Sequence, residues 1–277
     1  RTPASTVGEA ESLVMLGYGA LAVGDPVAAR AYLVEAEARC RPIGRLGTLA
    51  RVLVTLSFTA ALAGRTGQAR SYGAEGRALA EETGQTRWVV TADLALGYVA
   101  ALRGDAEEAE RLASSVEPIL TAVGLFPMLA YVELTRGIVA AAAGDPARAV
   151  EHLARPFQPS EPCFHPQVRF WGLTQLAFAA VSSRRTRALD GAVAVARSTH
   201  AEVPAALLST GLAFVEAVRA GEADAPRAYE SALAAISPDW PFERARLQLG
   251  YGNWLRRHRR QGETRAQLTS AAAAFTA

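Results

Sequence analysis

The 277-residue chain contains no lysine, so arginine supplies all 29 of its basic side chains. It has only two cysteines, Cys40 and Cys163, which stand too far apart to suggest a disulfide framework, so we expect a cytoplasmic protein. Its longest uncharged run, Pro118 to Val132, contains prolines and a glycine and is too short to cross a bilayer, so no membrane partner is expected. A net charge of +2 argues against general electrostatic binding of nucleic acid.

Several kinds of chemistry lack their residues in this sequence. Without lysine there is no Gly-x-x-x-x-Gly-Lys phosphate loop, and neither Gly-x-Ser-x-Gly nor His-Glu-x-x-His occurs. Cys163 and His165 offer two metal ligands, but a zinc site needs three or four and no partner spacing is visible. We therefore expect no enzyme activity, no metal and no cofactor in this chain.

What the sequence does have is an internal repeat. Four glycines (Gly24, Gly64, Gly104 and Gly144) follow one another at intervals of 40 residues, and an alanine stands five residues after each (Ala29, Ala69, Ala109 and Ala149). The composition is half hydrophobic, and the abundance of alanine and leucine favours helix. A period of this size in a helical sequence predicts a solenoid of stacked helical hairpins.

The residues around each repeated glycine predict how one hairpin turns. Glycine ends the first helix because it adopts the left-handed conformation at low cost. Asp25, Asp105 and Asp145 come next and can accept hydrogen bonds from the free N–H groups of the second helix. Small residues recur seven positions before each glycine, at Gly17, Ser57, Gly97 and Gly137, which predicts close contact between the paired helices.

These patterns predict one all-α domain over residues 1–277, built as a right-handed superhelix (an α-α solenoid) of about seven hairpins. The hairpins are expected at 7–23 with 26–40, 45–63 with 66–83, 86–103 with 105–122, 127–143 with 146–155, 167–182 with 184–198, 202–219 with 225–236, and 242–259 with 263–275. Residues 156–166 hold four prolines and cannot be helical, so they form either a lid over a surface or a linker that acts as an internal hinge.

One stretch carries a family resemblance. Residues 241–268 combine a Pro-Phe-Glu-Arg-Ala-Arg helix start, a Leu-Arg-Arg run at 255–257 and a following helix with Arg-Ala-Gln-Leu at 265–268. This stretch closely resembles the last helical repeat of the large ATP-binding transcriptional regulators of the LuxR family, in which that last helix reads Ala-Arg-x-x-Leu. The upstream repeats resemble the tetratricopeptide-like (TPR-like) hairpins of the same regulators, although their unit is longer than a true tetratricopeptide repeat.

The resemblance implies a function as well as a fold. Members of that family carry an ATPase module, then a TPR-like superhelix, then a LuxR-type helix-turn-helix, and the resemblance covers only the superhelix. It implies a ligand-sensing and protein-interaction (oligomerisation) domain, excised from modules that would bind ATP and DNA. The expected partners are a small-molecule inducer or a protein, with self-association in the parent regulator. The alternative is a stand-alone TPR-like scaffold that binds proteins and has no role on DNA.

The candidate binding surface is the concave side of the superhelix, which the first helix of each hairpin lines. Equivalent positions on those helices carry seven residues with aromatic or polar side chains: Tyr18, Arg51, Phe58, Thr91, Tyr98, Tyr131 and Phe170. Aromatic rings with polar tips suit a sugar, a polyketide-like ligand or a peptide, whereas the alternative is that the rings fill the core between repeats.

Two charged features leave alternatives open. Glu133 and Arg136 stand at helical spacing, so they either pair with each other or mark a polar point in the groove. Residues 256–260, Arg-Arg-His-Arg-Arg, either complement the dipole at a helix end or contact DNA or an acidic neighbouring module.

Overall fold

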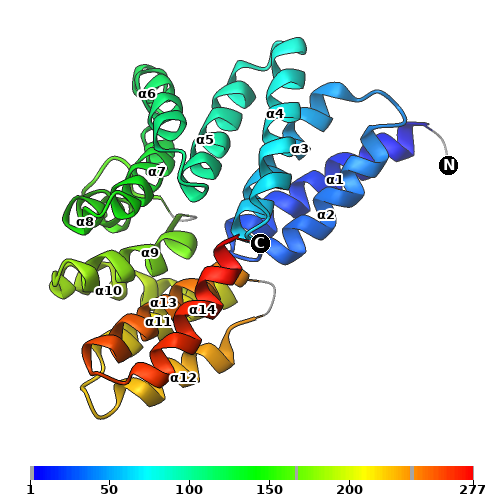
Figure 1. The fold of residues 1–277 in the computed structure, drawn as a ribbon. Helices are drawn as coiled ribbons and strands as arrows, with labels where there is room; N and C mark the ends of the chain where they lie inside the picture. The colour runs from blue at the N-terminus through cyan, green and yellow to red at the C-terminus, as the bar shows by residue number, and fades with distance from the viewer. Residues whose placement is uncertain (1–2, 166–167, 238–239, 277) are drawn as a thin grey trace.

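The computed structural model describes residues 3–165, 168–237 and 240–276, and these ranges are entirely helical apart from turns and loops. Within them lie fourteen α-helices that pair into seven consecutive hairpins (Figure 1). They are α1 (Pro3–Ala22) with α2 (Pro26–Cys40), α3 (Leu46–Leu62) with α4 (Thr66–Glu82), α5 (Thr86–Leu102) with α6 (Ala106–Ala122), α7 (Leu129–Ala142) with α8 (Pro146–Ala154), α9 (Val168–Ser182) with α10 (Leu189–Glu202), α11 (Ala206–Arg219) with α12 (Ala225–Ala235), and α13 (Pro241–Arg257) with α14 (Gln261–Thr276). Short 3-10 turns, η1 (Phe126–Met128), η2 (Arg155–Phe157) and η3 (Thr186–Ala188), flank three of them.

The hairpin turns have the predicted construction. The glycines at 24, 64, 104 and 144 all have φ between +76° and +79°. The aspartates that follow cap the next helix, since the Asp25 carboxylate accepts from the N–H of Ala28 at 2.9 Å and Asp145 from that of Arg148 at 3.0 Å. In the fifth hairpin Arg184 occupies the corresponding position with φ +59°, although the sequence has no glycine there.

Small residues do bring paired helices together. A Cβ added to Gly17 would stand 2.6 Å from Cγ of Leu33, and one added to Gly137 would stand 2.4 Å from Cγ of Leu153. The alanines at 29, 69, 109 and 149 are fully buried. Gly17 and Gly137 therefore allow the predicted close contact between paired helices, each with a large side chain of the partner helix against it.

The predicted helix bounds are wrong in the fifth and sixth hairpins. We expected helices at 184–198 and 202–219, but α10 runs from Leu189 to Glu202 and α11 starts at Ala206. Pro204 explains the later start of α11, because a proline disfavours the helical conformation of the residue before it, and Val203 is extended with φ −131° and ψ 91°. The later start of α10 follows from the turn before it, where Arg184 is left-handed and Thr186–Ala188 form η3.

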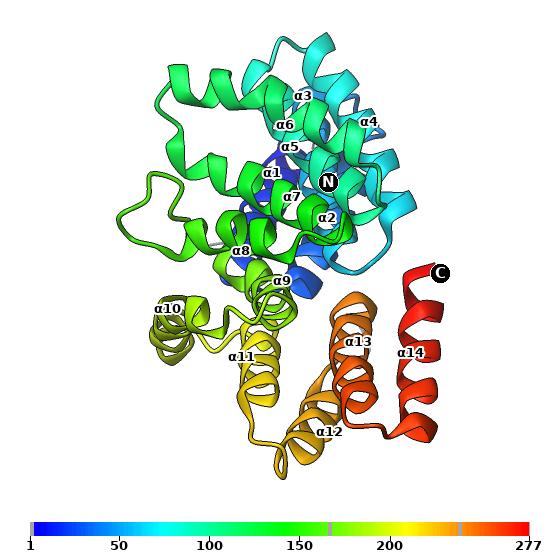
Figure 2. The same cartoon turned by 60° about the vertical axis from the view of Figure 1, so that its left-hand side comes forward.

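The array of hairpins curves until its two ends meet. Figures 1 and 2 show the later hairpins turning back towards the first ones, so that α13 and α14 approach the base of α3 and α4. A Cβ added at Gly64 would stand 3.0 Å from Cδ1 of Phe242, and one added at Gly24 would stand 2.6 Å from Cδ1 of Phe170. The turns of the first two hairpins thus pack on helices more than a hundred residues away, and one apolar core runs from Leu21 to Leu255.

None of the helices in the described part of the chain is long and apolar enough to cross a lipid bilayer. The proline-rich segment is described as far as His165, while Pro166 and Gln167 lie outside the described residues. At the start of this segment Arg155 forms an ion pair with Glu161, and Arg155 Nη2 lies 2.9 Å from Glu161 Oε2. Cys163, within the segment, is buried.

Candidate ligand pocket

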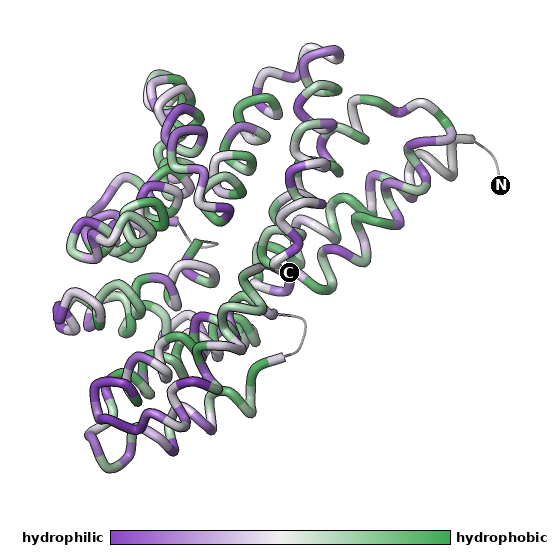
Figure 3. The backbone as a smooth tube through the Cα atoms, viewed as in Figure 1, coloured by the Kyte–Doolittle hydropathy of each residue, from purple (hydrophilic) through white to green (hydrophobic). Residues whose placement is uncertain are grey.

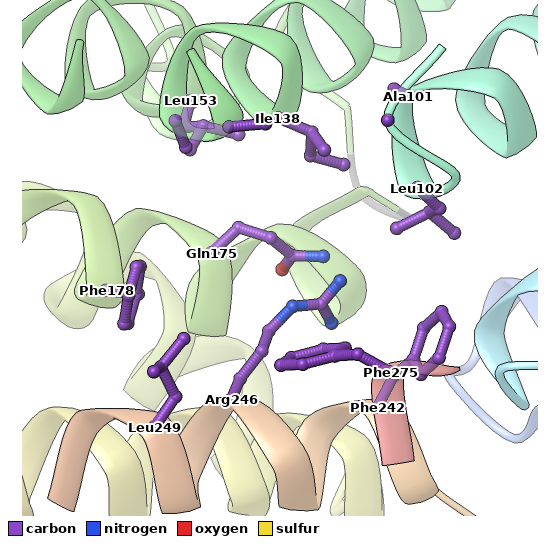
Figure 4. Close-up of a pocket in the computed structure, with 13 residues that line it drawn as sticks. Ala101, Leu102, Ile138, Leu153, Gln175, Phe178, Phe242, Arg246, Leu249 and Phe275 are labelled. Carbon is purple, nitrogen blue, oxygen red and sulfur yellow. The ribbon is translucent and has the colours of Figure 1, made fainter. Parts of the chain in front are cut away.

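A cavity of about 310 Å³ lies where the curved array closes on itself (Figure 4). One wall comes from the C-terminal ends of α5 and α7 together with α8, and the other from α9, α13 and α14. The lining residues are Ala101, Leu102, Gly104, Ile138, Ala141, Ala142 and Leu153 on the first wall, and Gln175, Phe178, Phe242, Arg246, Leu249 and Phe275 on the second. The size suits a small organic molecule, and most of the lining is aliphatic or aromatic.

The polar groups of this pocket gather at one corner. Figure 4 shows the Gln175 amide, from α9, and the Arg246 guanidinium, from α13, pointing towards each other. Gln175 is only 6% exposed, and neither its Oε1 nor its Nε2 has a hydrogen-bond partner within the part of the chain that the structure describes. A buried amide without partners costs free energy, so this corner is suited to receive a polar group.

The Arg246 side chain in this corner also belongs to an ion pair within α13. Arg246 donates from Nη1 to Oε1 of Glu243, one turn earlier in the helix, and both side chains are largely buried. The second carboxylate oxygen of Glu243 is buried without a partner among the described residues. The pair is close to neutral as a unit, because the two opposite charges compensate each other.

The charges of Arg246 and Glu243 both act on the Tyr98 phenol. Burial raises the pKa of the Tyr98 phenol far above its ordinary value, and the charge of Glu243 raises it while that of Arg246 lowers it. The phenol therefore stays protonated at neutral pH and adds no charge to the interior around the pocket.

The seven residues predicted to bind a ligand lie in three places, and none of them lines this pocket. Phe58, Tyr98, Tyr131 and Phe170 are 1–5% exposed and belong to the apolar core. The rings of Phe58, Tyr98 and Tyr131 surround Trp171 at centroid distances of 5.7, 6.4 and 5.5 Å. The structure thus groups these rings by packing, and their role in ligand binding stays a prediction.

Tyr18 and Arg51 lie at the opposite, N-terminal end of the array. Arg51 Nη2 is 2.7 Å from Oε2 of Glu11, and the Tyr18 ring stacks on that of Trp88 at 5.9 Å. Burial raises the pKa of Tyr18 to about 12. Thr91 lies apart from both and lines a separate groove between α5, α6 and η1.

Glu133 and Arg136 do not pair with each other, so that alternative was wrong. Glu133 accepts from Arg155 Nη1 at 2.5 Å and lies 2.7 Å from His152 Nδ1, whereas Arg136 bonds Glu110 and Glu117. Their i, i+3 spacing would allow a pair, but each of the two meets partners on other elements instead: Glu133 meets His152 and Arg155, and Arg136 meets two carboxylates of α6. Glu133 therefore connects α7 to α8 and to the proline-rich segment.

The basic run at 256–260 lies at the end of α13 and in the turn to α14, where Figure 3 shows a cluster of hydrophilic residues. Two of its members have partners, since the His258 ring stacks on Trp254 at 3.9 Å and Arg260 Nη2 is 2.7 Å from Glu263. A contact of this basic run to DNA stays a prediction.

Among the described residues, no group of three or more His, Cys, Asp and Glu side chains could hold a metal ion.

A partial signal for the pocket was present in the sequence. Ala101 and Ala141 occupy one column of the 40-residue repeat, and the column that holds Gln175 has Thr55, Ala95 and Thr135 at its earlier positions. The long side chain of Gln175, at a position where the earlier repeats have short side chains, was thus a signal for the pocket. The meeting of α9 and α13 with α5 and α7 was not visible, because the later hairpins depart from the 40-residue register.

No family model matches the chain, and no curated protein matches it in sequence.

Proposed function

We propose that this chain is a small-molecule-sensing domain, with the pocket between α5, α7, α9, α13 and α14 as its ligand site. The observation that carries the proposal is an apolar cavity of about 310 Å³ with one buried, unpartnered amide, that of Gln175, in its wall. Ligand pockets typically combine such an apolar lining with a few convergent polar groups.

The position of the pocket suits a sensor. Its walls come from hairpins far apart in the sequence, and they meet only because the array closes. A molecule that contacts both walls stabilises the closed arrangement over a more open one, in proportion to its difference in affinity for the two. Binding would thereby set the curvature of the whole array.

The resemblance to LuxR-family regulators supports a role in transcription control. Phe242, Glu243 and Arg246 belong to the Pro-Phe-Glu-Arg-Ala-Arg stretch that carries this resemblance, and Phe242 and Arg246 line the pocket. In this proposal the hairpins form a right-handed TPR-like superhelix that passes a ligand signal to an ATPase and a helix-turn-helix module of the parent regulator.

A thermal-shift screen of metabolites tests the sensing role. At least one compound should raise the melting temperature of the wild-type chain, because a ligand of the native state stabilises it. Ala141→Phe should abolish that shift by filling the cavity, whereas Ala143→Phe, at an exposed position outside the lining, should keep it. A shift that is equal in both variants would place the ligand elsewhere.

Sequencing the DNA that flanks the coding region tests the regulator. We expect a phosphate-loop module upstream and a helix-turn-helix module beyond Ala277. A stop codon at that point and no ATPase module upstream would leave the stand-alone scaffold.

A second observation favours protein interaction. A groove of about 490 Å³ is lined mainly by apolar side chains of α5, α6 and η1, and Ile119, Val123 and Leu125 on its rim are 42–62% exposed. Exposed apolar patches mark interaction sites, and we infer that this groove serves self-association. In analytical ultracentrifugation, Val123→Glu should weaken concentration-dependent association, and Val34→Glu on exposed α2 should not.

A further inference from the structure

The polar corner of the pocket determines which head group a ligand must carry. The Gln175 side chain presents one acceptor, Oε1, and one donor group, Nε2, and neither has a partner among the described residues. At 6% exposure the amide is shielded from bulk water. Its missing partner must therefore offer a donor and an acceptor side by side, and must reach the corner from within the cavity.

The neighbouring ion pair disfavours a charged head group. The side chains of Arg246 and Glu243 are 13% and 7% exposed and are paired with each other. A carboxylate entering the corner would add a second negative charge beside Glu243, and an ammonium would add a second positive charge beside Arg246. Either ion leaves the corner with one uncompensated charge that is shielded from bulk water, which is unfavourable.

The remainder of the lining favours an apolar body with a ring. Phe178, Phe242 and Phe275 contribute aromatic faces, while Ile138 and Leu249 contribute aliphatic surface. Apart from the corner, the wall offers a ligand little opportunity for hydrogen bonding, so polar groups beyond the head would lose their hydration without compensation.

We propose that the pocket selects neutral carboxamides with an apolar body, the carboxamide pairing reciprocally with the Gln175 side chain. In this arrangement Nε2 of Gln175 donates to the ligand carbonyl and Oε1 accepts from the ligand N–H. This inference rests on the proposed function, since it specifies the ligand class of the same site.

Four probes that share a phenyl ring and differ in the head group test the preference: benzamide, benzoate, benzylammonium and toluene. Their dissociation constants are measured by NMR titration of the complete chain. Benzamide should bind about tenfold more tightly than each of the other three, which corresponds to two modest hydrogen bonds. Equal affinity for benzamide and toluene, or a preference for either ion, would overturn the carboxamide inference while leaving a ligand pocket in place.

Substitution of Gln175 tests whether its side chain is the partner of the ligand carboxamide. Gln175→Leu should reduce benzamide binding about tenfold, to the level of toluene, and leave toluene binding unchanged. The variant should fold, because it replaces a buried unpartnered amide with an apolar side chain of similar size. Gln248→Leu, the same change at a half-buried position outside the lining, should leave the binding of both probes unchanged.

The two proposals fail differently. If Gln175→Leu keeps the full preference for benzamide, the inferred pairing is wrong but the pocket stands. If no probe binds and Ala141→Phe leaves the thermal shifts of the metabolite screen unchanged, both the carboxamide inference and the ligand pocket are overturned.

Discussion

Arg184 and Arg259 occupy left-handed turn positions, which are glycine in the first four hairpins. They have φ +59° and +61°, a left-handed conformation that costs a side-chain-bearing residue about 1 kcal/mol or more. The turn at Arg184 still closes as in the first four hairpins, with the N–H of Arg185 donating to Ala180 O at 2.8 Å. The geometry of the turn is thus imposed by the packing of the two helices.

Replacing either arginine with glycine should stabilise the protein. We expect Arg184→Gly and Arg259→Gly each to raise the free energy of unfolding by about 1 kcal/mol, measured by urea denaturation. Arg185→Gly is the matched control, since Arg185 has φ −100° and gains no relief from strain, so its stability should fall. No gain from either of the first two substitutions would show that the turns are unstrained.

Within a helix, the value of a glycine depends on what its partner helix places beside it. Gly17 and Gly19 lie two residues apart in α1, yet a Cβ at Gly17 would meet Leu33 at 2.6 Å and one at Gly19 would meet nothing within 4 Å. Leu33 is fully buried and has little room to move. Substitution by alanine should therefore change the stability of the protein in opposite directions at the two positions.

Gly17→Ala should lower the free energy of unfolding by roughly 1–3 kcal/mol, because it overpacks the contact between α1 and α2. Gly19→Ala should raise it by up to about 1 kcal/mol, because alanine favours helix and no clash opposes it. Thermal unfolding monitored by circular dichroism measures both. Similar effects from the two substitutions would contradict the close approach at Gly17.

The proline-rich segment makes the structure sensitive to pH through His165. Burial, followed by the positive charge of Arg169, lowers the pKa of His165 from 6.5 to about 4. Its Nδ1 also accepts from the N–H of Val168 at 3.4 Å, which requires an unprotonated nitrogen. The native state therefore binds fewer protons than the unfolded state between these two pH values.

Stability from His165 should be complete above pH 6.5 and be lost as the pH falls towards 4, by up to about 3 kcal/mol. Urea denaturation of the wild type and of His165→Asn across this range measures the difference, since asparagine keeps an acceptor but does not titrate. Parallel curves for the two proteins would show that His165 is protonated equally in both states.

The elements differ in how far the sequence predicts them. The first four hairpins follow from Gly24 and its equivalents because each turn depends on local chemistry: a left-handed glycine, a small residue seven positions earlier and, in three of the four, a capping carboxylate. The all-α class and the pairing of neighbouring helices were predictable for the same reason. The pocket was not, since Gln175 and Arg246 are brought together by the curvature of the whole array, and small angles summed over several repeats are not encoded at any one position.

At the scale of the whole molecule, closure depends on a few side chains that bridge the two ends of the array. Phe242 is 8% exposed, lies against the Gly64 turn, and also lines the pocket. Its ring is 5.8 Å from that of Phe275 and 6.0 Å from the guanidinium carbon of Arg246. One aromatic ring thus joins the closing contact to the ligand site.

Phe242→Ala should open the array. Removing the ring should lower stability by about 3 kcal/mol and leave only Pro241 of the last hairpin against the Gly64 turn, so the radius of gyration in small-angle X-ray scattering should increase. Phe126→Ala, at a 41% exposed position in η1, is the matched control and should leave the scattering curve unchanged. A destabilised variant with an unchanged radius would mean that the other contacts, such as Phe170 against Gly24, close the array without Phe242.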